Sequence, residues 1–449
     1  MSLGRALLRR LLALDQGAEL QASTCLHMAD TVGIALAATR LSGLLEPLLE
    51  SQATADGPCH VLGLDRGLPP AQAAFVNAAL AHALDFDDIH DAARLHPTPV
   101  CFSAALAAAE YAGADDPAQL LRATALGNEL MCRLGLACAP TGSGPVADWF
   151  LTQLFGYAGA ALSAGLLLGL DEEGLVSALG LACMQAAGSK QAGMGTGSNA
   201  RAIYPAFAAQ GGVQAALMAR AGFSGPAEAL DGAAGLLRLY LGMAPEDAAA
   251  ALLQMRGWQA LDIDFKPWPC CRISHPYVAA AFALRARLQG RSPQRLRVLV
   301  NASARRLCEP LAGRCRPRTL QDAKYSIPFM TAFALHHGAV DLDRLDERAL
   351  RDEAVLALAA RIELDPSLAD MPGHPPARVQ AQLQDGVWLD CGADPALLAP
   401  AAAQLRAKFI DAAGRAGHAR PQALWALWLD AHRGGVGLGA MMRATRIAG

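Results

Sequence analysis

Residues 264–277 read DFKPWPCCRISHPY, and the pattern of the chain changes at this segment. Before it, to about residue 258, the sequence consists of apolar helical segments punctuated by Gly and Pro, with no convincing strand. After it, apolar and polar residues begin to alternate. The proline-rich segment therefore marks a junction between a helical domain and a domain that contains strands.

Three short segments downstream of the junction alternate as strands do. Residues 295–300 read RLRVLV, and residues 361–365 show the same period of two. Residues 378–384 read RVQAQLQ, and Asp385-Gly386 then turns the chain into VWL, which is a hairpin signal. Helical stretches lie between these strands, so a small α+β domain is expected.

Alanine-rich helical sequence returns beyond Pro395 and is expected to pack on the first domain. The predicted fold is mainly α: a large all-α helical domain with a second, smaller α+β domain. The expected boundaries are 1–258 for the first part of the helical domain, 259–396 for the α+β domain and 397–449 for the returning helices.

The amino-acid composition restricts which partners the protein can bind and in which cellular compartment it is expected. The net charge of -3 leaves no basic excess for nucleic acid or for an anionic membrane surface. Eleven cysteines without CxxC spacing indicate a reducing, cytoplasmic compartment, and only Cys270 and Cys271 are adjacent, too few for an iron–sulfur centre. Residues 1–16 read as an amphipathic helix, and residues 151–170 as a buried helix of a water-soluble protein.

The densest polar cluster lies in residues 81–99, AHALDFDDIHDAARLHPTP. If the preceding helix runs to about Ile89, His82 and Asp85 share a face, whereas His96 precedes a proline and must be extended. A helix end with exposed acids is the alternative interpretation. The cluster comprises His82, Asp85, Asp87, Asp88, His90, Asp91, Arg94 and His96.

Two motifs suggest other functions. Residues 87–91 match the DDxxD magnesium-diphosphate motif of helical isoprenoid synthases, but no second acidic motif follows and aromatic residues are scarce. The glycines at 193, 195 and 197 follow helical sequence and no strand, so a dinucleotide site is not expected. A turn whose N–H groups hold a carboxylate is the interpretation left for them.

Lysine is scarce in this chain, so each lysine is a candidate for a specific structural or functional role. Lys266 lies in the proline-rich junction beside Arg272 and His275, and domain junctions favour small-ligand pockets. A compact ammonium group can bind a carboxylate. The four lysines are Lys190, Lys266, Lys324 and Lys408.

Three segments together resemble the signature of the MmgE/PrpD family, which includes 2-methylcitrate dehydratase, cis-aconitate decarboxylase and iminodisuccinate epimerase. They are HALDFDD at 82–88 followed by HP at 96–97, KPWPCCRISH at 266–275, and DAKYSIPF at 322–329. The resemblance implies an all-α domain made from both chain ends, an inserted α+β domain, a homodimer and an active site between the domains. It also implies no metal or organic cofactor and a small polycarboxylate substrate.

Residue by residue, the resemblance assigns active-site positions. Asp85 and His96 match the acidic and histidine positions of the family, and Lys266 matches its junction lysine. We expect His96 to be the general base or acid, with Asp85 orienting it or sharing the proton. Tyr204 is expected to donate a proton, and the expected carboxylate-binding residues are Lys266, Arg201, Arg272, His275 and Lys190.

Three departures indicate a rebuilt pocket. Ile89 stands where the family has a hydroxyl residue, and Phe150-Leu151 stands where it has a histidine-proline pair. Arg201 replaces a family lysine, with Tyr204 in place of a histidine. The expected function is a hydro-lyase or decarboxylase that removes a proton next to a carboxylate. An epimerase or isomerase of a dicarboxylate, or a noncatalytic carboxylate-binding dimer, is the alternative.

Overall fold

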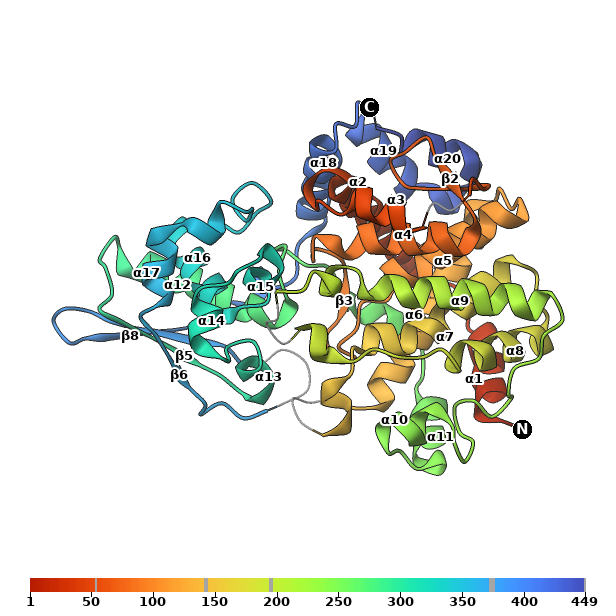
Figure 1. Ribbon diagram of the computed structural model, residues 1–449, viewed down its shortest axis with the longest axis horizontal. Helices are drawn as coiled ribbons and strands as arrows, with labels where there is room; N and C mark the ends of the chain where they lie inside the picture. Colours follow the sequence, from red (N-terminus) through yellow and green to blue (C-terminus); the bar gives the residue numbers. More distant parts are fainter. Residues whose placement is uncertain (53–54, 141–143, 194–196, 371–375, 448–449) are drawn as a thin grey trace.

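The computed structural model describes all residues except 53–54, 141–143, 194–196, 371–375 and 448–449. Figure 1 shows two lobes, a larger one made of helices and a smaller one in which helices pack on a sheet. The predicted fold class, mainly α with a smaller α+β domain, is confirmed.

The helices of the larger lobe pack at short distances because their facing residues are alanine and glycine. A Cβ added at Gly212 would lie 2.3 Å from the Cβ of Ala160, so these two helices touch almost backbone to backbone. The helices are α1 (Leu3–Leu12), α2 (Ala18–Leu41), α3 (Leu45–Gln52), α4 (Pro70–Ala83), α5 (Thr98–Ala112), α6 (Pro117–Ala137), α7 (Leu151–Leu167), α8 (Glu172–Cys183), α9 (Tyr204–Arg220), α10 (Leu236–Leu241) and α11 (Pro245–Gln254).

The C-terminal helices lie beside α2 at the top of the larger lobe in Figure 1. They are α18 (Ala402–Arg415), α19 (Pro421–Leu429) and α20 (Leu438–Ala444). Phe409 of α18 packs against Gly33 of α2, where an added Cβ would lie 2.7 Å from the ring. One hydrophobic core is thus built from both ends of the chain. The boundaries at 258/259 and 396/397 stay predictions.

The smaller lobe contains a four-stranded sheet with the order β6-β5-β7-β8. Its strands are β5 (Arg295–Leu299), β6 (Ile362–Asp365), β7 (Arg378–Gln382) and β8 (Trp388–Gly392). β5 is parallel to β6 and antiparallel to β7, and β7 pairs with β8 in the predicted hairpin. Alternate strand residues are buried in a second hydrophobic core with three helices, α12 (His275–Leu288), α16 (Ile327–His337) and α17 (Glu353–Ala359).

The short elements of the chain correct two expectations. The helix expected to run to about Ile89 ends at Ala83, because Asp85 adopts a left-handed backbone with φ +55°. Residues 89–90 instead form strand β3 (Ile89–His90), which pairs antiparallel with β4 (Ile263–Asp264). The region before residue 258 also contains β1 (Cys59–His60) and β2 (Gly67–Leu68), so it is not free of strands. The remaining short helices are α13 (Ala302–Arg305), α14 (Leu311–Cys315) and α15 (Leu320–Lys324).

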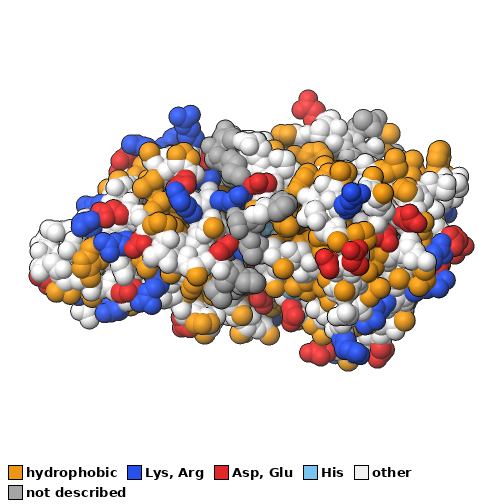
Figure 2. All heavy atoms as spheres, turned by 90° about the horizontal axis from the view of Figure 1, so that it is seen from below, with side chains coloured by type: hydrophobic (Ala, Val, Ile, Leu, Met, Phe, Trp, Pro, Cys, Tyr) orange, Lys and Arg blue, Asp and Glu red, His pale blue; other side chains and the backbone are white. Residues whose placement is uncertain are grey.

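Helix α7, the longest uncharged stretch of the sequence, is almost entirely buried. Within the described ranges, no single helix has both the length and the apolar character to cross a membrane; α2 and α3 pass that test only as a pair bent by 98°. On the face shown in Figure 2, basic and acidic side chains are interspersed over both lobes.

Candidate active site

A cavity of about 110 Å³ lies where the two lobes meet. Loops of the larger lobe form most of its wall, and Ser303 and Tyr325 close it from the smaller lobe. The lining residues are Asp85, Ile89, Asp91, Arg94, His96, Phe150, Leu151, Thr152, Lys190, Arg201, Tyr204, Cys271, Arg272, Ile273, Ser303 and Tyr325. Six of the eight residues expected from the sequence are among them; Lys266 and His275 are not.

The loop between α4 and α5 carries the acid and the histidine of the site. Its backbone is left-handed at Asp85 and again at Arg94, with φ values of +55° and +53°. Few residues other than glycine adopt this conformation, and such strain often persists at functional sites. The pairing of β3 with β4 and a hydrogen bond from the His90 N–H to the Leu95 carbonyl (2.9 Å) fix the loop.

Asp85 is held by Lys266 from behind the cavity wall. The Lys266 ammonium is fully buried and donates to Asp85 Oδ1 (2.5 Å) and to the Asp85 carbonyl (3.1 Å). Burial disfavours the charged carboxylate, but the charge of Lys266, together with other nearby positive charge and hydrogen bonds from Lys266 and Tyr325, outweighs burial and lowers the pKa of Asp85. Lys266, expected to bind a substrate carboxylate directly, is thus engaged with Asp85 in this structure.

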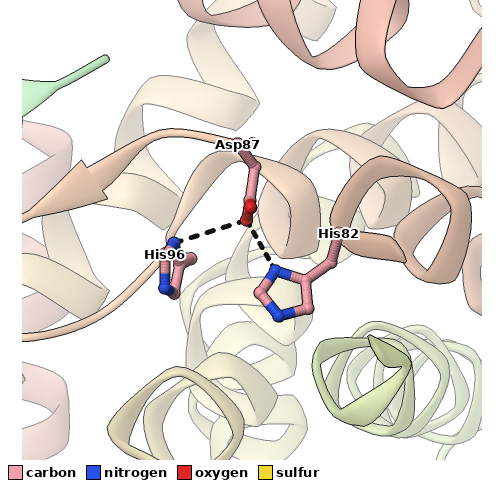
Figure 3. Close-up of side chains that lie close together, drawn as sticks. All are labelled: His82, Asp87 and His96. Atoms are coloured by element: carbon pink, nitrogen blue, oxygen red, sulfur yellow. Dashed lines mark hydrogen bonds and ion pairs between the residues drawn. The ribbon is translucent and has the colours of Figure 1, made fainter. Parts of the chain in front are cut away.

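His96 reaches the cavity with one edge of its ring. Its Nδ1 lies 2.6 Å from the carbonyl of Asp88 and 3.4 Å from Asp87 Oδ2. A carbonyl only accepts hydrogen bonds, so the geometry assigns the proton to Nδ1 and leaves a lone pair on Nε2. Figure 3 shows Nδ1 turned toward Asp87 and the other ring nitrogen turned away. Burial lowers the pKa of His96 to about 4, so the imidazole is neutral at pH 7.

Behind His96, Asp87 connects two histidines (Figure 3). His82 Nδ1 lies 2.8 Å from Asp87 Oδ2, and the rings of His82 and His96 meet edge to face at 5.1 Å between centroids. The sequence analysis named Asp87 and His82 in the cluster but gave them no role. In the structure they form the support for His96.

Among the described residues, two groups of side chains have ligand atoms close enough to hold a metal ion; within each group these atoms lie within 4.8 Å of one another. In the first, His82, Asp87 and His96, hydrogen bonds already engage both Nδ1 atoms. The second lies on the surface of the smaller lobe and comprises His336, His337 and Asp352.

Two cations of the cavity have no carboxylate within ion-pair distance among the residues that the structure describes. The Arg201 guanidinium lies over the ring of Tyr325, 3.3 Å from its centroid, and near the ring of Phe150 at 4.9 Å. Lys190 Nζ donates to the Ala147 carbonyl (2.8 Å). Burial, followed by the positive charge of Arg201, lowers the pKa of Lys190 to about 8. Such a site attracts an anion.

Two other cations of the cavity are engaged by the protein itself. Arg272 forms a fork with Asp91, through Nε (3.0 Å) and Nη2 (2.8 Å), and also donates to the Leu398 carbonyl. Arg94 donates to Ser303 Oγ (2.8 Å). Arg272, expected to bind substrate, therefore lines the cavity with its charge balanced by Asp91.

Two tyrosine hydroxyls complete the polar lining. Tyr204 donates to Thr152 Oγ1 (3.3 Å), which in turn accepts the backbone N–H of His96 (2.9 Å). Burial raises the pKa of Tyr204 and of Tyr325, so both hydroxyls stay protonated. The sequence analysis gave Tyr325 no role, although it lies in the DAKYSIPF segment that carried the resemblance.

His275 lies outside the cavity. It is fully buried at the start of α12, with Nε2 3.1 Å from the Cys270 carbonyl and its ring against Trp268. Burial lowers its pKa well below the usual range, so the ring is neutral. Its place in the structure indicates a packing role at the junction, where substrate binding was expected.

The two motifs that suggested other functions can now be placed. Asp87 faces His82, and Asp88 Oδ2 lies 3.0 Å from His27 Nδ1, both below the surface. Asp91 is bound to Arg272. The three acids of DDxxD therefore do not converge on one cation site. The glycine motif at 193–197 lies largely outside the described residues.

Comparison with known proteins agrees with this architecture. The MmgE/PrpD N-terminal domain model matches residues 12–248, and the C-terminal domain model matches residues 268–422. The chain belongs to the MmgE/PrpD family. The resemblance seen in the sequence is thus confirmed.

Curated relatives of the chain carry names of one kind. The cis-aconitate decarboxylase-like protein oryM of Aspergillus oryzae is 30% identical over 361 residues, 74% of this chain and 72% of that protein. A cis-aconitate decarboxylase of Aspergillus terreus is 31% identical over 54% of this chain, which spans half of that protein's length. The human cis-aconitate decarboxylase is 26% identical over 67% of this chain and 62% of its own length. The chain is a divergent family member.

The departures expected from the family pattern all fall on the cavity. Ile89, Phe150 and Leu151 form an apolar wall together with Ile273. Phe150 also stacks on Tyr204, with 4.3 Å between ring centroids and 19° between planes. This MmgE/PrpD cavity therefore combines an apolar wall with His96 and with the cations Arg201 and Lys190.

Proposed function

We propose that this chain is a cofactor-independent lyase, a dehydratase or decarboxylase, that acts on a small polycarboxylate by removing a proton next to a carboxylate. The observation that carries the proposal is the neutral imidazole of His96 in a cavity with two cations that lack carboxylate partners among the described residues. The names of the relatives support a lyase. The eight site residues expected from the sequence keep the status of proposals.

Substrate binding is assigned to Arg201 and Lys190. A substrate carboxylate at each of them would gain charge-assisted hydrogen bonds in a site shielded from water. Positive charge beside the carboxylate also stabilises the negative charge that develops when the neighbouring carbon loses its proton. Arg201 keeps its charge at any working pH, whereas Lys190 is charged below about pH 8.

Proton removal is assigned to His96. Its Nε2 carries the lone pair, and Asp87 and the Asp88 carbonyl hold Nδ1–H, which fixes the tautomer. A base with a low pKa is neutral at pH 7 and thus ready to accept a proton. Asp85 stays ionised beside Lys266.

The second half of the reaction needs an acid, and the protonated hydroxyls of Tyr204 and Tyr325 are available. In a dehydratase such a hydroxyl would protonate the leaving hydroxide. In a decarboxylase it would protonate the carbon that keeps the electron pair of the broken C–CO₂ bond, and protonated His96 would return the proton that it had removed. Return of the proton to the opposite face of the same carbon would make the chain an epimerase.

Incubation of the purified chain with a panel of unsaturated and hydroxylated di- and tricarboxylates tests the proposal. We expect at least one compound to lose water or CO₂, detected by NMR, and we expect Arg201→Ala to raise KM for it. Inversion of a stereocentre without loss of a group would identify an epimerase. Binding without any reaction would identify the noncatalytic alternative and overturn the proposal.

A further inference from the structure

The backbone that carries two residues of the apolar wall, Ile89 and Phe150, is held by hydrogen bonds and strand pairing. Ile89 is fixed because its strand pairs with β4, opposite Asp264. Phe150 is fixed because its backbone N–H donates to the Gly188 carbonyl (2.6 Å) and its carbonyl accepts the N–H of Leu154 in the first turn of α7. Both side chains are buried, at 7% and 5% exposure. The backbone that carries Ile89 and Phe150 is therefore held in place.

The ring of Phe150 is also held from two sides. Tyr204 stacks on it at 4.3 Å, and the Arg201 guanidinium lies 4.9 Å from its centroid. Swinging the ring out would disturb the residue assigned to carboxylate binding. The apolar surface of Phe150, Ile89, Leu151 and Ile273 is therefore a permanent part of the site.

The number of cavity cations without a carboxylate partner among the described residues limits the number of carboxylates that a substrate can carry. Arg201 and Lys190 have no carboxylate partner in the described part of the chain. Arg272, in contrast, forms an ion pair with Asp91. Arg94 is engaged by Ser303 and feels the charge of Asp370. A third substrate carboxylate would therefore face the apolar wall without a cation, and a buried, unpaired charge is strongly disfavoured.

We propose that the substrate is a dicarboxylate with an alkyl arm, whose two carboxylates bind at Arg201 and Lys190 and whose arm lies against Phe150 and Ile89. This inference rests on the proposed function, because it uses the same carboxylate-binding residues. Burial of the alkyl arm removes apolar surface from water, which favours binding. A tricarboxylate has a charged group in place of the arm and lacks this contribution to the binding free energy.

Two unreactive ligands of nearly the same shape test the inference. 2-Ethylsuccinate has an ethyl group where propane-1,2,3-tricarboxylate has a carboxymethyl group. We expect titration calorimetry at pH 7 and fixed ionic strength to give at least tenfold tighter binding of 2-ethylsuccinate, about 1.4 kcal/mol. In the double variant Ile89→Thr/Phe150→His the preference should fall below threefold.

Phe207→His is the matched control, because Phe207 is 43% exposed on α9 and is not among the cavity residues. It should keep the full preference. Equal or tighter binding of the tricarboxylate by the unaltered chain would overturn the inference and leave the proposed function standing. Failure of both ligands to bind would overturn the proposed function as well. If the folded double variant, or Ile89→Thr alone, keeps the whole preference, the apolar wall is not its source.

Discussion

Replacing Asp87 with asparagine tests whether the supports of His96 serve catalysis. The substitution keeps the shape of the side chain but removes the charge that lies 2.8 Å from His82 Nδ1 and 3.4 Å from His96 Nδ1. A hydrogen bond to a charged group contributes about 1.5–3 kcal/mol, against about 0.5–1.5 kcal/mol for a neutral one. The loss of about 1–1.5 kcal/mol at the transition state predicts a kcat lower by about tenfold.

The pH profile supplies a second readout that a purely structural role would not change. Only neutral His96 accepts a proton, so kcat/KM should fall as pH falls through the pKa of His96, about 4. The negative charge of Asp87 raises that pKa, against the stronger effect of burial. In Asp87→Asn the acidic limb should therefore move to lower pH while the plateau drops.

Asp411→Asn is the control, because Asp411 is a half-exposed acid of α18 paired with Arg415, on the surface of the larger lobe. Rates are measured from pH 3.5 to 8 with the substrate found in the panel, on variants shown by circular dichroism and melting to be folded. A folded Asp87→Asn protein with an unshifted acidic limb and a kcat within twofold of the unaltered chain would refute the reasoning.

Further predictions concern affinity, stability, metal and assembly. KM should rise as pH increases through about 8, because Lys190 then loses its charge, and a KM constant to pH 9.5 would remove Lys190 from the binding site. Lys266→Ala should lower the free energy of unfolding by about 3–5 kcal/mol, because the buried carboxylate of Asp85 loses its partner; denaturant titration measures it, and a change under 1 kcal/mol would contradict the pairing. Activity should survive exhaustive chelation, and loss that a divalent ion restores would place a metal in the mechanism. Light scattering should give a homodimer, and a 46.7 kDa species alone at micromolar concentrations would contradict that expectation.

The sequence predicted the elements whose pattern is local. The alternation in residues 295–300 and 378–384 specifies β5 and β7, and the Asp385-Gly386 turn specifies the hairpin of β7 and β8, without help from distant contacts. The end of α4 could not be predicted in the same way. Asp85 leaves the helix because Lys266, 181 residues away, holds its carboxylate, and because β3 finds its partner in β4.

The same distinction, between local sequence patterns and distant contacts, applies to the candidate site. The residue types of Asp85 and His96 could be read from one dense segment, and the structure brings both to the cavity with Lys190, Arg201, Tyr204 and Arg272. Which cation keeps a free charge depends on pairings such as Arg272 with Asp91, which no local pattern reveals. Tyr325 was missed because nothing in its local sequence shows that its side chain lines the cavity.

Solvent exchange tests the central claim, proton transfer by His96, most directly. The purified chain and its His96→Asn variant are incubated in D₂O with the di- and tricarboxylate panel, and deuterium at the carbon next to a carboxylate is followed by proton NMR. The account predicts deuterium incorporation or deuterated product for at least one compound, slower by roughly 100-fold or more in folded His96→Asn, with ligand affinity changed little. Incorporation at an equal rate in the variant, or none for any compound that binds, would contradict it.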